Sequence, residues 1–296
     1  MRFIRDIYSE ARAAGRPAIS FEFFTPKTDE GEQRFFEQVM PALAALRPDY
    51  CSVTYGAGGS TQSRTFSMVD RIQREFGIPC MAHLTCVGAT REAIRTLLRD
   101  ARERGIRNIL ALRGDPPEGA DGFTPVEGGF RYAAELVDVI RELGDFGIGV
   151  AGFPEGHLEN REGRLADWGH LRAKIERGAD FVLTQIFFDN RFFHEFRAHL
   201  NGALQVRVPL VPGIIPIMSA GQIERFTALC GATIPAALAR RLEALKDDNA
   251  AAAAFGVEFA TEQCVDLLRA GVPGLHFYTL NKVASTQAIL AKLGLS

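Results

Sequence analysis

The sequence predicts an α/β fold in which eight parallel strands alternate with helices. Two observations support this fold class. Short apolar runs rich in β-branched and aromatic residues are separated by stretches with helical periodicity, and polar residues recur at the same end of the runs. Eight such units within 296 residues predict one (β/α)8 barrel domain over residues 1–296, with a doubly wound open sheet as the alternative. An extra N-terminal helix is predicted before the first strand, and extra helices before the last one.

The strands are predicted from alternation or from continuous apolar character. In the first strand, Ser20 and Glu22 alternate with apolar residues, and Pro26 marks the end. The other strands are apolar runs bounded by glycine, proline or charged residues. They are predicted over residues 50–56, 79–86, 108–114, 147–153, 180–188, 210–216 and 274–281.

The helices are predicted from apolar stripes and from their caps. The extra N-terminal helix lies before Gly15, and Thr90 caps a helix that is closed at Gly105. Further helices are predicted over 31–46, 64–76, 132–143, 168–177 and 192–199. Helices fill 220–270 with breaks near 231–235 and 247–249, and a last helix ends at Leu293.

Composition excludes several classes of protein. A net charge of -2 gives no basic surface for nucleic acid or membranes, and no apolar run is long enough to cross a bilayer. The five cysteines form no CxxC pair, and the charged, amphipathic N-terminal segment is unlike a signal peptide. We therefore expect a cytoplasmic protein with reduced thiols and a large core.

Three candidate motifs are rejected. Cys80 and Cys86 flank His83, but in a strand they face the side opposite to His83, so no metal site is expected. Gly147-x-Gly149-x-x-Gly152 has the spacing of a dinucleotide fingerprint, but its glycines lie inside a strand and follow a helix. The lysines avoid apolar positions within strands, which disfavours Schiff-base chemistry.

Polar residues gather at the carboxyl ends of the predicted strands, where a barrel of this kind places its active site. Glu22 stands out because phenylalanines flank it, and an apolar setting would raise the pKa of its carboxyl and make it a proton donor near neutral pH. The alternative is an outward-facing glutamate on an edge strand. The set is Glu22, Thr54, His83, Arg113, Asp115, Gln185, Asn281 and Lys282.

Other members of this set also have structural alternatives. Arg113 and Asp115 could pair with each other, or flank a glycine that lets the backbone approach a ligand. His83 could be a core histidine. Gln185, in the most apolar strand, needs hydrogen-bond partners, and its donor and acceptor suit the edge of a heterocycle. Residues 153–157 and 167–174 could hold a ribose and phosphates, or form a solvated helix face.

Together, these segments resemble methylenetetrahydrofolate reductases. The matching pieces occur in family order over nearly the whole chain: Ser20-Phe-Glu-Phe-Phe24, Val53-Thr-Tyr-Gly56, His83-Leu-Thr-Cys86, Leu112-Arg-Gly-Asp115, Pro154-Glu-x-His157, Thr184-Gln185, Pro212-Gly-Ile-Ile-Pro216 and His276-Phe-Tyr-Thr-Leu-Asn281. The chain stops where the barrel should, so the resemblance is to the short, flavin-dependent bacterial form.

The resemblance implies an enzyme that reduces 5,10-methylenetetrahydrofolate to 5-methyltetrahydrofolate, for methionine biosynthesis. NADH or NADPH would pass hydride to FAD and leave before the folate takes its place. By resemblance, Glu22 is the acid that opens the folate ring, Asp115 is the carboxylate beside the flavin, and a homo-oligomer is expected. Gln185 and Lys282, with Glu22, match substrate-binding residues. The matching FAD residues are Thr54, His83, Leu112, Arg113, Gly114, Asp115, Tyr132, Ala151, His157, Asp167, His170 and Lys174.

The sequence departs from the family pattern at several of these positions. Phe153 stands where a tyrosine is expected, and Ala173 replaces an arginine near the pyrophosphate. Lys282 replaces an arginine, so a bidentate contact becomes a point charge. The competing hypotheses are a flavin-free barrel lyase or aldolase that uses the strand-end carboxylates, and a non-catalytic folate-binding protein.

Overall fold

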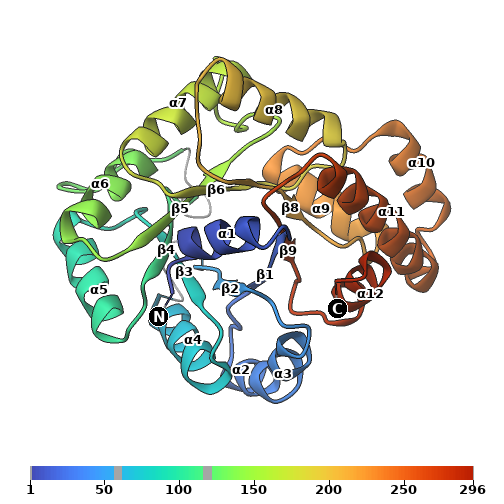
Figure 1. Cartoon of the computed structure of the whole chain (residues 1–296), viewed down its shortest axis with the longest axis horizontal. Coiled ribbons are helices and arrows are strands. Elements are labelled where there is room, and N and C mark those ends of the chain that lie inside the picture. The colour runs from blue at the N-terminus through green and yellow to red at the C-terminus, as the bar shows by residue number, and fades with distance from the viewer. Residues whose placement is uncertain (1, 57–61, 116–121, 296) are drawn as a thin grey trace.

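The computed structural model describes residues 2–56, 62–115 and 122–295. Within them, nine parallel strands form one sheet in the order β7-β6-β5-β4-β3-β2-β1-β9-β8. Figure 1 shows this sheet at the centre of the molecule with helices around it. The strands are β1 Ala18–Phe23, β2 Tyr50–Val53, β3 Cys80–Thr85, β4 Asn108–Leu112, β5 Gly147–Gly152, β6 Phe181–Thr184, β7 Leu210–Val211, β8 Gly213–Ile214 and β9 Gly274–Tyr278. The predicted barrel is confirmed.

The ninth strand arises because the seventh predicted strand is divided in two. β7 pairs with β6, β8 pairs with β9, and Pro212 lies between them. Proline has no N–H to donate to a ladder, so the chain leaves one neighbour at Pro212 and joins the other. The prediction of one continuous strand over 210–216 is therefore wrong, because two short strands occupy this segment. Its two parts bring the ends of the sheet together and close the barrel.

The helices cover the outside of the sheet, except for α1 (Figure 1). The Thr90 cap is confirmed, because its Oγ1 accepts from the Ala93 N–H at 3.2 Å. The helix predicted over 31–46 is interrupted by a π-helical turn, η1, just before Pro41, which cannot donate to the helical ladder. Within the described residues, no helix is both long and apolar enough to span a membrane. The helices are α1 Ile4–Ala13, α2 Asp29–Arg34, η1 Phe35–Val39, α3 Met40–Ala44, α4 Gln62–Phe76, α5 Arg91–Glu103, α6 Ala133–Leu143, α7 Arg164–Glu176, α8 Asn190–Gly202, α9 Ala220–Cys230, α10 Ala236–Ala244, α11 Asn249–Arg269 and α12 Ala284–Leu293.

Alternation along the strands separates two cores. Outward residues such as Phe21 and Phe23 pack against the surrounding helices. Inward residues near the amino ends of the strands, among them Tyr50, Met81 and Phe181, pack against the apolar face of α1. The predicted extra helix α1 is therefore confirmed, and it covers the amino end of the barrel. The opposite end holds polar residues inside the barrel, and residues after β6 and β8 form a third apolar cluster with α9 and α10.

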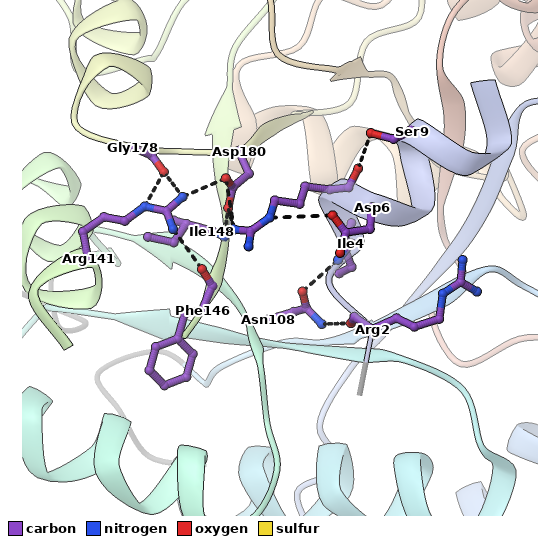
Figure 2. Close-up of polar contacts among 11 residues, drawn as sticks. Arg2, Ile4, Asp6, Ser9, Asn108, Arg141, Phe146, Ile148, Gly178 and Asp180 are labelled. Carbon is purple, nitrogen blue, oxygen red and sulfur yellow. Dashed lines mark hydrogen bonds and ion pairs between the residues drawn. The ribbon is translucent and has the colours of Figure 1, made fainter. Parts of the chain in front are cut away.

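Polar contacts fix α1 to the strands (Figure 2). Asn108 Oδ1 accepts from the Ile4 N–H at 2.9 Å, and its Nδ2 donates to the Arg2 carbonyl at 3.0 Å. Asp180, just before β6, pairs with Arg5 of α1 at 3.3 Å and with Arg141 of α6 at 2.7 Å. These contacts join the first helix to the middle of the chain.

Candidate active site

Glu22 lies on the inner face of β1, near its carboxyl end, opposite Ser52 of β2 and Tyr278 of β9. It is 8% exposed. Its Oε2 lies 3.2 Å from Nε2 of His83 and 3.2 Å from Nε2 of His276. Ser52 Oγ donates to the same oxygen at 3.4 Å. Strands β2, β3 and β9 therefore bring three polar groups to one carboxylate oxygen.

The two imidazoles are held differently. His276 is hydrogen-bonded through Nε2 to Glu22 and through Nδ1 to Ser20 Oγ at 2.8 Å. The contact of His83 Nε2 with Glu22 is outside hydrogen-bond geometry, and this buried nitrogen bonds no described residue. Buried ring nitrogens are normally hydrogen-bonded. His276 is thus hydrogen-bonded at both ring nitrogens, whereas His83 Nε2 is held by its ion-pair contact with Glu22.

The charge state of Glu22 differs from the sequence-based expectation. Burial raises the pKa of its carboxyl, but the opposing effects of His83 and His276 outweigh burial and lower that pKa from 4.5 to about 2. The predicted raised pKa is therefore wrong. Its premise fails because Phe21 and Phe23 face the helices, while the imidazoles share the inner face with Glu22.

A cavity of about 350 Å³ adjoins Arg113, the residue that follows β4. The Arg113 guanidinium pairs with Glu159 at 2.7 Å and lies 4.9 Å from the centre of the Phe123 ring. The structure thus pairs Arg113 with Glu159 and not with Asp115. Tyr132, 60% exposed, completes an aromatic and cationic lining that suits a phosphate-bearing ligand with a flat ring. The lining residues are Arg113, Phe123, Pro125, Arg131, Tyr132 and Glu159.

A second group of ionisable residues lies beside β5. Lys174 Nζ donates to the Ala151 carbonyl at 3.0 Å, and burial lowers the pKa of its amine to about 8 against the opposing charge of Asp167. Burial also raises the pKa of Asp167 and lowers that of His157. His170 is exposed on the same helix as Lys174. Several perturbed groups beside a strand end are typical of a functional site.

The remaining cofactor residues of the sequence analysis follow or end strands β2 and β4. Thr54 Oγ1 accepts from the Thr25 N–H at 3.3 Å. Leu112 is the last residue of β4. Gly114 has φ +87, and a Cβ there would lie 2.7 Å from Val87 Cγ1, so this position requires glycine for both conformation and space.

Of the predicted substrate residues, Glu22 lies on β1, whereas Gln185 and Lys282 lie outside the strands. β6 ends at Thr184, so the strand predicted over 180–188 is too long, and Gln185 is half-buried just beyond it. The partner of its Oε1 is the Ile186 N–H at 2.8 Å. Asp115 and Lys282 are exposed, and Pro116 lies outside the described residues.

The rejected metal motif has the predicted geometry. Cys80 and Cys86 belong to the helix-facing core, whereas His83 points inward to Glu22. Throughout the part of the chain that the structure describes, no group of three or more His, Cys, Asp or Glu is arranged to hold a metal ion.

Comparison with known proteins identifies the family. The sequence profile of methylenetetrahydrofolate reductase matches residues 7–294. The chain belongs to the methylenetetrahydrofolate reductase family. It is 43% identical over 293 residues to methylenetetrahydrofolate reductase (NADH) 1 of Arabidopsis thaliana, covering 95% of this chain and 49% of that protein. It is 37% identical over 286 residues to 5,10-methylenetetrahydrofolate reductase of Escherichia coli (strain K12), covering 97% and 94%. The chain therefore spans about half the length of its plant relative.

A solved structure shares the fold of this family member. It is an uncharacterized protein from Clostridium thermocellum that binds two copies of 5-methyl-5,6,7,8-tetrahydrofolic acid. The match has a TM-score of 0.62 and covers 96% of each chain. At 16% sequence identity this likeness shows the fold alone.

The sequence analysis of this reductase-family member did not predict three polar residues of the Glu22 site. They are Ser20, Ser52 and His276. Their signal is alternation. Ser20 and Glu22 share one face of β1, and His276 stands between the apolar Leu275 and Phe277 of β9. Inward-facing polar residues in otherwise apolar strands therefore indicate the site before any motif does.

Proposed function

We propose that this chain reduces 5,10-methylenetetrahydrofolate to 5-methyltetrahydrofolate with NAD(P)H and FAD. The observation that carries the proposal is Glu22, a buried carboxylate between two imidazoles at the carboxyl end of the barrel in a member of this family. The relatives from E. coli and A. thaliana are named as methylenetetrahydrofolate reductases, and the plant name specifies NADH. The C. thermocellum protein of similar fold binds 5-methyltetrahydrofolic acid.

The residues on the β4 and β5 side of the barrel fit FAD. Arg113 and Arg131 offer cationic donors to a pyrophosphate, and the exposed Tyr132 ring offers a face for stacking. We assign the ribose and phosphates to Lys174 and His157. Bound FAD supplies a hydride carrier between NAD(P)H and the folate. The remaining proposed contacts are Thr54, His83, Leu112, Gly114, Asp115, Ala151, Asp167 and His170.

The proposed task of Glu22 concerns the folate N10. The product has a methyl group on N5 and a hydrogen on N10, so the bond from the bridging carbon to N10 breaks and N10 takes a proton. A carboxyl with a pKa of about 2 does not store a proton at neutral pH, whereas the ring nitrogens of His83 and His276 beside it are groups that can carry one. We assign the proton to the cluster that Glu22 forms with His83 and His276. The negative charge of Glu22 then favours the cationic N5 iminium that ring opening leaves.

The other proposed substrate residues supply binding and charge. Gln185 offers an amide at the strand end for the edge of the pterin, and Lys282 offers a charge for the carboxylates of the folate tail. Asp115 places a second negative charge at the same end of the barrel, which also favours the iminium. The family resemblance further leads us to propose that the chain forms a homo-oligomer.

The test is the visible spectrum of the purified, desalted protein under anaerobic conditions. We expect a flavin spectrum that bleaches with NADH or NADPH and recovers with methylenetetrahydrofolate. Glu22→Gln should still bleach with the nicotinamide but should not recover with the folate. A protein that stays colourless after FAD is added contradicts the cofactor assignment, and full folate turnover by Glu22→Gln contradicts the role of Glu22.

A further inference from the structure

Phe24 is an exposed aromatic side chain beside a buried acid. It directly follows β1, two residues beyond Glu22, and is 39% exposed. The two preceding phenylalanines, Phe21 and Phe23, are completely buried among the helices. Exposure of a large apolar ring at the open end of the barrel therefore distinguishes Phe24 from its neighbours.

Backbone hydrogen bonds show which way Phe24 faces. The Glu22 carbonyl accepts from the chain that follows β9, whereas the Phe23 carbonyl accepts from Thr54 on the β2 side. At Phe24 the direction alternates again: its N–H donates to Asn281 Oδ1 at 3.0 Å, and its carbonyl accepts from Asn281 Nδ2 at 2.9 Å. The extended course of β1 thus continues through Phe24, and alternation places its side chain on the inner face, with Glu22.

The segment that holds Phe24 has unusual backbone geometry. Leu280 and Asn281 have φ 54 and φ 55, the left-handed region that non-glycine residues seldom adopt. Thr279 Oγ1 donates to the Glu22 carbonyl at 2.7 Å and accepts from the Asn281 N–H at 3.3 Å. Strained backbone of this kind is concentrated at ligand-binding sites. Here the strained backbone at Leu280 and Asn281 lets the Asn281 side chain hold the backbone of Phe24.

We propose that Phe24 binds the benzoyl ring that is attached to the folate nitrogen protonated at the Glu22 cluster, with Asn281 as its positioning residue. The proposal rests on the proposed function. Two residues of a strand span roughly 6.5 Å, which is comparable with the reach of a benzoyl ring that extends outward from this nitrogen. Contact between the two rings covers the exposed face of Phe24 and adds the preference of aromatic pairs for one another.

The experiment measures the dissociation constant of 5-methyltetrahydrofolate by calorimetry on the full chain saturated with FAD. Phe24→Leu keeps an apolar side chain without the ring, and we expect it to weaken binding about fivefold. Phe24→Tyr should bind within about twofold of the wild type because it keeps the ring. The control is Leu229→Ala, which removes a side chain that is 71% exposed on α9 and should leave binding unchanged.

Asn281→Gly tests the side-chain hydrogen bonds of Asn281 to Phe24 separately from the backbone strain at Asn281. Glycine adopts φ 55 readily but lacks the amide, so binding should weaken although the backbone conformation is allowed. If Asn281 acts through Phe24, the double variant Phe24→Leu/Asn281→Gly should bind no more weakly than Phe24→Leu alone. Equal affinities for Phe24→Leu and the wild type would overturn the proposal, and additive losses would overturn the positioning role. A wild-type protein that binds no 5-methyltetrahydrofolate would instead contradict the proposed function.

Discussion

At the scale of single residues, the site depends on how one carboxylate oxygen is shared. Glu22 Oε2 meets His83, His276 and Ser52 at 3.2, 3.2 and 3.4 Å. A carboxylate in a low-dielectric interior is costly unless such donors and charges compensate for lost hydration. The same contacts that make the charge tolerable also connect it to groups that carry protons. The same cluster therefore determines the stability of the Glu22 charge and the proton supply that we propose.

The lowered pKa of Glu22 predicts an acid-dependent loss of stability. Its folded-state pKa of about 2 lies below the ordinary value of 4.5, so the contribution is fully present above pH 4.5 and is lost as pH falls toward 2. The difference corresponds to a free energy on the order of 3 kcal/mol. Urea unfolding should show wild type more stable than Glu22→Gln at pH 5, with the gap narrowing at pH 4 and pH 3. Glu92→Gln is the control, because this side chain is 72% exposed. A gap that stays constant below pH 4.5 would contradict the assignment.

At the scale of elements, barrel closure depends on a strand divided in two. Gly213, the first residue of β8, packs so closely against the Thr184 carbonyl and the Tyr278 ring that a side chain has no room there. Its N–H donates to Thr184 Oγ1 at 2.9 Å, and Tyr278 OH donates to the Thr184 carbonyl at 2.7 Å. The junction therefore links β6, β8 and β9 through side chains where the direct ladder is interrupted.

Gly213→Ala should weaken this junction. A Cβ at this position would lie 2.4 Å from the Thr184 carbonyl oxygen and 2.5 Å from the Tyr278 ring, and neither can move without disturbing a strand. We expect a loss of about 2–4 kcal/mol in the free energy of unfolding, measured by urea denaturation. Gly221→Ala in α9 is the matched control, because no atom lies within 4 Å of its Cβ, and it should be neutral or slightly stabilising. Similar effects for the two variants would show that the junction is looser than the structure indicates.

Periodicity predicts the type and order of the elements, but it does not predict contacts between strands. Apolar runs identified each strand position, and the strand-end rule brought Glu22 and His83 to one end of the barrel. The register between β1 and β9 brings His276 into contact with Glu22. Closure of the whole sheet sets this register, so no local sequence pattern predicts it. The pKa prediction failed for the same reason, since sequence neighbours of Glu22 point away and spatial neighbours decide its charge. The sequence predicted one continuous seventh strand through Pro212, and only the pairing of its two sides shows that it is divided and closes the barrel.

At the scale of the whole molecule, the two ends of the barrel have different tasks. The amino end is closed by α1, whose Ile4, Ile7 and Tyr8 pack on the inner strand residues. The carboxyl end contains the Glu22 cluster and the groups beside β4 and β5. Because α1 packs on the inner residues at the amino end, we expect ligands to approach the polar cluster from the carboxyl end.

Asn108→Ala tests whether α1 stabilises the barrel as a whole. The side chain is completely buried and bonds both the Ile4 N–H and the Arg2 carbonyl, so its loss leaves two backbone groups without these partners. We expect the free energy of unfolding to fall by about 2 kcal/mol, with faster hydrogen exchange across α1. Asn201→Ala, at an exposed position of α8, should change neither quantity. Because Asn108 lies at the far end of the barrel from Glu22, folate binding by the folded variant should match the wild type. Unchanged exchange in α1 would mean that apolar packing alone holds this helix in place.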